Sequence, residues 1–350
     1  MLVAPDFILS TRVLATASRR SNFAWRSRTH SPPLHHVPSI TRHIAAAFMF
    51  GATIVLALGA PSRARAQART SRPAHDEDPS PDMKPPASME EVAIQSHGSR
   101  MNGIVYLAAG AGKHPLVIFF HGYPGNERNL DLAQAVRRAG YQALYVDFRG
   151  MWGSGGTFSF ANGLEDARTI LAWARTPAIA AKYHFDPRRI AVVGHSFGGW
   201  LTLMTAAQEP RSVCVVGLAA WNVGLAAQRF GAHPDERAAN RDYFRATTAP
   251  GAPVHAGDLL GEMIAHARDY DYLAQAPAFG DRAVLLVGAT RDTPDEGVAV
   301  HQRMSAALRQ AGDTHVTVKQ FEDDHPFSNH RLALADLIVN WLSTDCASTQ

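Results

Sequence analysis

From about Val92 the chain alternates short apolar runs with stretches of helical periodicity, and this alternation predicts βαβ units around a mostly parallel sheet. Continuous apolar runs are typical of strands buried on both faces, whereas residues 315–321 alternate apolar and polar positions as an edge strand does. The sequence predicts buried strands at 115–120, 142–147, 189–194, 213–217 and 283–288, and helices at 129–139, 163–175, 198–208, 296–310 and 329–342.

Residues 221–280 interrupt this alternation. They separate two predicted core strands by much more than one crossover helix needs, and they mix helical pieces such as 261–270 with Pro, Gly and His. Ligands bind at the carboxyl ends of the strands in open α/β sheets. We therefore expect residues 221–280 to form a cap or lid over that edge.

The N-terminal part has the pattern of a targeting segment. An uncharged apolar run at 44–60 follows Arg42 and His43 and precedes two overlapping A-x-A sites within 64–68. We interpret 1–68 as a leader, 69–91 as a disordered linker rich in Pro, Ser, Asp and Arg, and 92–345 as the folded α/β domain.

The leader predicts export to the periplasm or the medium. An uncleaved membrane anchor through 44–60 is the alternative, because the run lies at the short limit for a membrane span. A transit peptide and a twin-arginine signal at Arg19 and Arg20 are weaker alternatives, since the apolar run and the A-x-A sites come later in the chain.

The net charge of +3 comes from the leader rather than from the predicted domain. Without the leader the remainder is acidic, so its electrostatics give no reason to expect nucleic-acid binding. Against the single acid Asp6, the first 72 residues contain Arg12, Arg19, Arg20, Arg26, Arg28, Arg42, Arg63, Arg65, Arg69 and Arg72.

The two cysteines lie in different settings. Cys214 is within an apolar run and Cys346 is in a polar tail, so the sequence predicts a buried free thiol at Cys214 and no disulfide. No group of Cys and His has the spacing of a metal site.

Residues 194–198 read Gly-His-Ser-Phe-Gly, a G-x-S-x-G pattern. The pattern directly follows an apolar strand and opens a helix, the setting in which a strained turn projects the serine above a sheet. We therefore predict Ser196 as a nucleophile; the alternative is a glycine-rich turn with an idle serine.

A serine nucleophile needs a histidine base and a carboxylate that orients it. Asp292 follows the predicted strand at 283–288, and His325 follows the last strand, so both lie at the carboxyl edge of the sheet. For Asp292 the alternative is a helix N-cap, a role that Asp295 can fill; for His325 the alternative is His330, which lies inside the predicted final helix.

Acyl transfer also requires backbone N–H donors for the oxyanion. We predict these donors at Phe197, after the nucleophile, and at Tyr123 in the loop His-Gly-Tyr-Pro-Gly of residues 121–125, where Pro124 has no N–H. A simple tight turn is the alternative for this loop.

Taken together, His121-Gly122, the stretch 147–150 with Gly153 and Gly155, the elbow 194–199, Asp292 and Asp324-His325 resemble the α/β-hydrolase superfamily. Over about 92–342 the chain looks most like dienelactone hydrolase and prolyl-oligopeptidase-like catalytic domains, in which the stretch at 147–150 braces loops. It departs from them in lacking an N-terminal propeller, in its HGYPG loop and in having serine where dienelactone hydrolase has cysteine.

This resemblance and the order Ser196, Asp292, His325 predict an α/β-hydrolase fold and a serine hydrolase acting on carboxylic esters, with no metal or organic cofactor. A small peptidase or amidase is the alternative activity, and a non-catalytic binding protein on this scaffold is the alternative class. The expected partner is a small ester or amide. Several aromatic residues are expected near the rim of the site, where they either form an apolar pocket for the substrate or pack in the core: Tyr123, Trp152, Phe158, Phe160 and Trp221.

Overall fold

The computed structural model describes residues 76–209, 213–247, 256–293 and 295–349. All of them belong to the unit Ala66–Gln350. The predicted leader at 1–68 and the first residues of the predicted linker lie outside the described residues.

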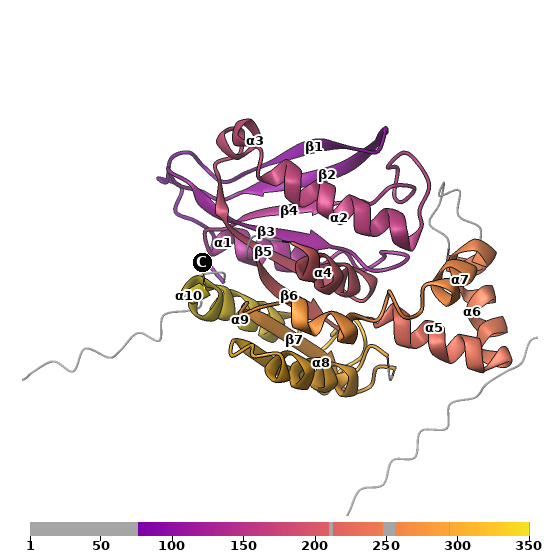
Figure 1. Ribbon diagram of the computed structural model, residues 1–350. Helices are drawn as coiled ribbons and strands as arrows, with labels where there is room; N and C mark the ends of the chain where they lie inside the picture. Colours follow the sequence, from indigo (N-terminus) through magenta and orange to yellow (C-terminus); the bar gives the residue numbers. More distant parts are fainter. Residues whose placement is uncertain (1–75, 210–212, 248–255, 294, 350) are drawn as a thin grey trace, which may run out of the picture. The chain divides into compact units, whose positions relative to one another are not determined.

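An eight-stranded sheet with the order β1-β2-β4-β3-β5-β6-β7-β8 runs through the unit (Figure 1). β4, β3, β5, β6, β7 and β8 pair in parallel, while β1 and β2 form an antiparallel hairpin whose second strand pairs antiparallel with β4. The strands are β1 Ser88–Ser96, β2 Ser99–Leu107, β3 His114–Phe120, β4 Gln142–Val146, β5 Phe185–His195, β6 Cys214–Leu218, β7 Val284–Ala289 and β8 Val316–Phe321.

Helices cover both faces of the sheet, as two apolar clusters show. One cluster joins the sheet to α2, α4 and α8, and the other joins it to α1 and α9. Among the described residues no helix combines the length and the apolar composition that a bilayer span requires. The helices outside the cap are α1 Leu130–Arg138, α2 Phe160–Ala174, α3 Pro177–Lys182, α4 Phe197–Gln208, α8 Val298–Gln310, α9 Arg331–Trp341, η2 Leu342–Cys346 and α10 Ala347–Thr349.

The buried parallel strands and the edge position of β8 confirm the sequence prediction, but the β1–β2 hairpin was not predicted. Its strands are only half buried, so they lack the continuous apolar run that identified the others. His97 and Gly98 connect them with positive φ angles of 47° and 79°, as a two-residue hairpin turn requires. β1 starts at Ser88, so the last four residues of the predicted linker 69–91 belong to the sheet.

The insertion between β6 and β7 forms the predicted cap, consisting of α5 Val223–Ala232, α6 Pro234–Thr247, α7 Ala256–Ala265 and the 3₁₀ helix η1 Tyr272–Ala278. In Figure 1 α5, α6 and α7 lie together beyond one end of the sheet. The helix expected at 261–270 differs from the observed α7, which begins earlier and ends at Ala265. Mixed Pro, Gly and His obscured the helix boundaries here.

A disulfide joins Cys214 and Cys346, with their Cα atoms 5.6 Å apart, so the predicted free thiol and the predicted absence of a disulfide are wrong. The supposed polar tail continues α9 as η2, and Leu342 and Cys346 are buried against the same cluster that holds Cys214. Sequence spacing did not show this because the cysteines are 132 residues apart.

Removing this cross-link with the double substitution Cys214→Ala and Cys346→Ala is expected to lower the free energy of unfolding by about 2–5 kcal/mol. The reason is that a bridge over a long loop restricts the unfolded chain. Urea unfolding of the wild type, with and without reductant, and of the double variant measures the effect. Identical midpoints for all three would contradict the prediction.

Candidate active site

Ser196 lies on the turn between β5 and α4 with φ 57° and ψ −119°. This backbone conformation costs a non-glycine residue about 1–3 kcal/mol and persists only where its surroundings enforce it. Three backbone hydrogen bonds do so: Ser196 N–H donates to Leu218 O at 2.9 Å, and Ser196 O accepts from the N–H groups of Trp200 at 3.1 Å and Trp221 at 3.0 Å. The turn thus holds the serine side chain at the carboxyl end of β5.

The glycines on either side of Ser196 are required by close packing. A Cβ on Gly194 would overlap the carbonyl group of Gly198, and a Cβ on Gly198 would overlap the carbonyl group of Phe120 in β3. Only a residue without a side chain fits either position. This is the physical reason for the G-x-S-x-G pattern in this chain.

His325 Nδ1 lies 2.7 Å from Asp292 Oδ2, although 33 residues separate the two in sequence. The Asp292 side chain is 3% exposed and the His325 side chain 33%. Burial opposes protonation of His325, but the hydrogen bond to Asp292 and the nearby charge of Glu296 outweigh it and raise the pKa of the imidazole. With Nδ1 donating to Asp292, the neutral ring has a free electron pair on Nε2.

The loop that carries His325 is anchored by the buried carboxylate of Asp323. It accepts hydrogen bonds from His330 Nδ1 at 2.8 Å, Asn329 N–H at 2.9 Å and Arg291 Nη2 at 3.2 Å. Burial alone would raise the pKa of Asp323, but the hydrogen bonds from His330, from the Asp324 backbone and from Asn329 outweigh it and lower the pKa. His330, the rival histidine, lies just before α9 rather than inside it and serves this anchor.

His195 fixes the same loop from the other side. Its Nε2–H donates to the backbone carbonyl of His325 at 3.0 Å, and the two rings lie 4.6 Å apart between centroids. Burial, followed by the charge of His325, lowers the pKa of His195 to about 3. His195 therefore stays neutral and contributes a hydrogen bond rather than a charge.

Of the two predicted oxyanion donors, Phe197 directly follows Ser196 in the chain and Tyr123 lines the same cleft as Ser196. Phe197 is the first residue of α4, so its N–H has no partner within the helix. Tyr123 follows Gly122, where an added Cβ would be 3.2 Å from Ser196 Cβ. The loop thus passes close to the serine, and the Tyr123 ring stacks on Phe158 at 5.3 Å.

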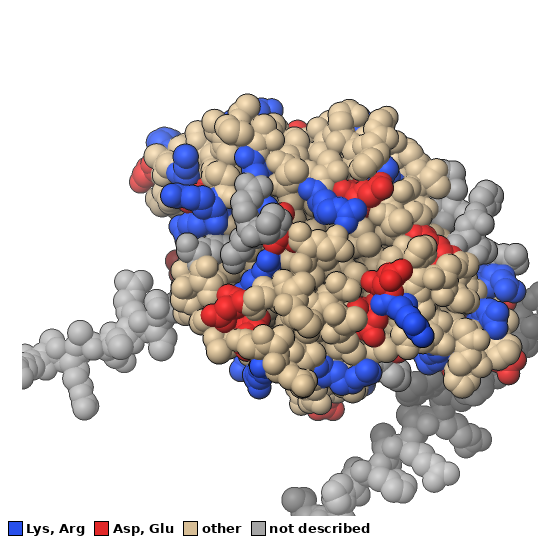
Figure 2. Space-filling model, in the orientation of Figure 1, with Lys and Arg blue, Asp and Glu red and all other residues tan. Residues whose placement is uncertain are grey.

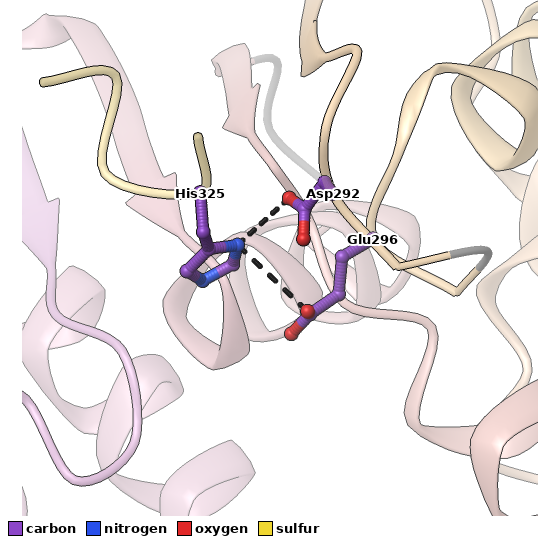
Figure 3. Close-up of side chains that lie close together, drawn as sticks. All are labelled: Asp292, Glu296 and His325. Atoms are coloured by element: carbon purple, nitrogen blue, oxygen red, sulfur yellow. Dashed lines mark hydrogen bonds and ion pairs between the residues drawn. The ribbon is translucent and has the colours of Figure 1, made fainter. Parts of the chain in front are cut away.

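Glu296 is a site residue that the sequence reasoning missed. Its Oε1 accepts a hydrogen bond from Ser196 Oγ at 3.3 Å, and its Oε2 lies 3.7 Å from His325 Nδ1 (Figure 3). Burial raises the pKa of Glu296 to about 7, although the charge of His325 opposes the shift. The sequence predicted a helix at 296–310 that includes Glu296, whereas α8 begins at Val298. The one feature of the sequence that could have pointed to Glu296 as a site residue is its position four residues after Asp292.

A cleft of about 280 Å³ opens over these groups. Its walls combine the site with apolar side chains of the cap. Of the predicted rim aromatics, Tyr123 and Trp221 line it, whereas Phe158 and Phe160 are buried in the core. The lining residues are Tyr123, Ser196, Trp221, Arg229, Phe230, Asn240, Tyr243, Phe244, Thr293, Glu296 and His325.

Arg229 of α5 ties the cap to the loop of Asp292 and Glu296. Its guanidinium donates to Asp295 at 2.6 Å and to Glu236 of α6 at 2.6 Å. Neither Asp292 nor Asp295 caps α8, because Gly297 occupies the N-cap position. Asp295 instead fixes the cap against the site.

The stretch at 147–150 braces the structure away from the cleft. Arg149 Nε lies 2.5 Å from Asp166 Oδ1, and its backbone N–H donates to Asp166 Oδ2 at 2.9 Å. Asp166 also accepts a hydrogen bond from Ser96 at 2.6 Å, so this buried cluster joins α2 to β1. None of its members lines the cleft.

Asp292, Glu296 and His325 offer potential metal-ligand atoms within 4.8 Å of one another. In the structure these atoms bond to protein groups: His325 to Asp292, and Glu296 to Ser196 and Thr293. The hydrogen bonds account for the proximity of the three side chains without a metal ion.

A family model described as "Alpha/beta hydrolase family" matches residues 117–337, a span that contains the elbow and both Asp292 and His325. The chain belongs to the α/β-hydrolase family. It is accordingly a hydrolase, and the eight-stranded, mostly parallel sheet with flanking helices is the fold that the sequence predicted.

Solved structures with the same fold include Est1E from Butyrivibrio proteoclasticus, crystallised with ferulic acid, at 16% identity and a TM-score of 0.54, covering 73% of this chain and 99% of that one. An esterase from Pyrococcus furiosus has 16% identity and a TM-score of 0.53, with coverages of 73% and 92%. An acylaminoacyl peptidase from Pyrococcus horikoshii has 16% identity and a TM-score of 0.55, with coverages of 74% and 42%. At these identities the likeness establishes the fold.

One curated protein, the quorum-quenching protein AidA of Acinetobacter baumannii (strain MDR-ZJ06), is 28% identical over 137 residues. The alignment covers 37% of this chain and 43% of AidA, so it spans less than half of that relative.

Proposed function

We propose that this hydrolase cleaves carboxylic esters through an acyl-enzyme intermediate on Ser196. The observation that carries the proposal is the hydrogen bond from His325 Nδ1 to Asp292, in a cleft that Ser196 and His325 both line. Asp292 selects the tautomer with a free Nε2, and a base of this kind is what a serine hydroxyl needs in order to attack.

In the proposed reaction the Ser196 hydroxyl turns from Glu296 toward His325 Nε2 and attacks the ester carbonyl carbon. Its proton passes to Nε2, and the backbone N–H groups of Phe197 and Tyr123 stabilise the oxyanion. The C–O bond to the alcohol then breaks as His325 returns the proton to the leaving oxygen. Water, deprotonated by His325, attacks the acyl-enzyme and releases the acid and the Ser196 hydroxyl.

Esters are favoured over amides because an alkoxide is a better leaving group than an amine. The aromatic wall formed by Trp221, Phe230 and Phe244 supports an acyl or alcohol group that is itself apolar. Among the described residues that line the cleft, Arg229 is the one arginine or lysine, and its guanidinium is already paired with Asp295 and Glu236 rather than free for a negatively charged substrate.

The test is incubation of the mature protein with a fluorophosphonate probe and, separately, with short-chain p-nitrophenyl esters and matched p-nitroanilides. Labelling with ester turnover is the expected result. Labelling with turnover of the anilides alone favours the peptidase alternative, and no labelling of the folded protein favours a non-catalytic binding protein.

We further propose that the protein is exported. Disulfides persist in oxidising compartments, so the Cys214–Cys346 bridge supports the export signal expected at 44–60. Cell fractionation and N-terminal sequencing are expected to find a chain processed within 64–68 outside the cytoplasm. Recovery of the unprocessed chain in the cytoplasm alone would refute export.

A further inference from the structure

The carboxylate of Glu296 lies close to both the hydroxyl of Ser196 and the imidazole of His325, whereas Asp292 bonds to the imidazole. Glu296 accepts the Ser196 hydroxyl at 3.3 Å through Oε1, while its Oε2 is 3.7 Å from His325 Nδ1. Figure 3 shows Glu296 and Asp292 on the same side of the imidazole, both directed at Nδ1. Two groups of the proposed reaction, the Ser196 hydroxyl and the His325 imidazole, therefore both lie beside the Glu296 carboxylate.

Glu296 is held in this place by its own loop. Thr293 Oγ1 donates to Glu296 Oε2 at 3.1 Å, and Glu296 N–H donates to Thr293 O at 3.2 Å. The Glu296 side chain is 17% exposed, so water screens its charge only weakly. Asp295, the adjacent residue, is fixed to Arg229 of the cap at 2.6 Å. The hydrogen bonds with Thr293 and the ion pair of the neighbouring Asp295 with the cap thus hold Glu296 in place.

We propose that Glu296 is a positioning residue for the reaction: it holds the Ser196 hydroxyl in the free enzyme and places a second negative charge beside His325. The inference rests on the proposed function. It adds to the predicted site a group that does not react but governs the protonation of the base and the resting position of the nucleophile.

The physical consequence concerns the histidine proton. A negative charge near Nδ1 favours the imidazolium, so His325 keeps its proton to higher pH than it would beside Asp292 alone. The same charge stabilises the imidazolium that forms when Ser196 attacks. Glu296 and His325 titrate as a pair, because each charge changes the proton affinity of the other. The titratable and charged groups around Glu296 are His325, Asp292, Asp295, Arg229 and Tyr272.

The experiment is the pH profile of kcat/KM for ester hydrolysis by the wild type and by Glu296→Gln. The amide keeps the size and an acceptor for Ser196 but removes the charge. We expect the acidic limb of the profile to move to lower pH, since His325 then loses its proton more easily, and the plateau to fall on the order of tenfold. An acidic limb that stays in place overturns the proposal.

Two further variants separate charge from structure. Glu322→Gln removes a carboxylate from the exposed end of the same histidine loop and is expected to leave the profile unchanged. Glu296→Asp retains a charge and is expected to keep the acidic limb nearer to that of the wild type. A limb that moves equally in Glu322→Gln, or as far in Glu296→Asp as in Glu296→Gln, contradicts the inference.

The role of Glu296 can be tested even in a variant that no longer hydrolyses the ester. The rate of fluorophosphonate labelling against pH reports the same base without an ester, and Glu296→Ala replaces the amide variant if the latter does not fold. If the wild type itself is not labelled, the proposed function fails. If the wild type is labelled and the Glu296 variants share its pH profile, only the role of Glu296 fails.

Discussion

Replacing Ser196 with alanine is expected to reduce kcat for ester hydrolysis on the order of a millionfold and to abolish fluorophosphonate labelling. The substitution removes the atom that forms the acyl-enzyme. What remains is the cleft with its backbone donors, which retain only the part of the catalysis that does not need a nucleophile. Initial rates with a p-nitrophenyl ester and gel detection of the probe measure the two effects.

A matched control is Ser343→Ala, because Ser343 is an exposed serine in η2 whose hydroxyl donates to the Asn340 carbonyl at 2.8 Å. The Ser343→Ala variant is expected to react with the fluorophosphonate probe and to hydrolyse the ester as the wild type does. Labelling that persists in Ser196→Ala would mean that another residue reacts with the probe. Ester turnover that persists would refute the acyl-enzyme on Ser196.

Replacing Asp292 with asparagine is expected to lower kcat by about 10⁴-fold while leaving the fold intact. An asparagine at this position can donate its amide N–H to Nδ1, which favours the tautomer whose proton is on Nε2. The imidazole then presents a proton rather than an electron pair to Ser196, and its cationic form loses the 2.7 Å hydrogen bond to a carboxylate. Stopped-time assays and slow probe labelling detect the residual activity.

The control for Asp292 is Asp324→Asn, which removes a carboxylate adjacent to His325 in sequence. Asp324 bonds to Ser328 at 2.9 Å rather than to the ring, so its loss is expected to change kcat by less than about tenfold. Near-normal activity of Asp292→Asn, together with a collapse in Glu296→Gln, would assign the orienting role to Glu296 instead.

On the face in view in Figure 2, the positive and negative side chains lie intermixed. This distribution agrees with the ion pairs that join Arg229 to Asp295 and Glu236, and Arg331 to Asp131. Such surface pairs contribute little to stability individually. At the cleft, where Arg229 is one partner, the pairing matters more because it connects the cap to the loop of Asp292.

The sequence by itself determined the features that depend on local pattern. Buried parallel strands give continuous apolar runs, and a strained strand-to-helix turn needs glycines at 194 and 198. The core strands and the turn that carries Ser196 could therefore be predicted from the sequence. Chain order placed Asp292 and His325 after successive strands, and parallel strands end at one edge of a sheet, which is why two distant residues could be expected together.

Only the tertiary structure decided the features that depend on packing between distant segments. The Cys214–Cys346 bridge exists because η2 packs under β6, and no periodicity reports that contact. Glu296 joined the site because α8 begins two residues later than its pattern indicates, which frees that carboxylate to turn toward Ser196. The cap helices contribute Phe230 and Phe244 to the lining of the cleft. The spacing of these residues in the sequence could not predict this, because the direction of a helical side chain depends on how the helices pack.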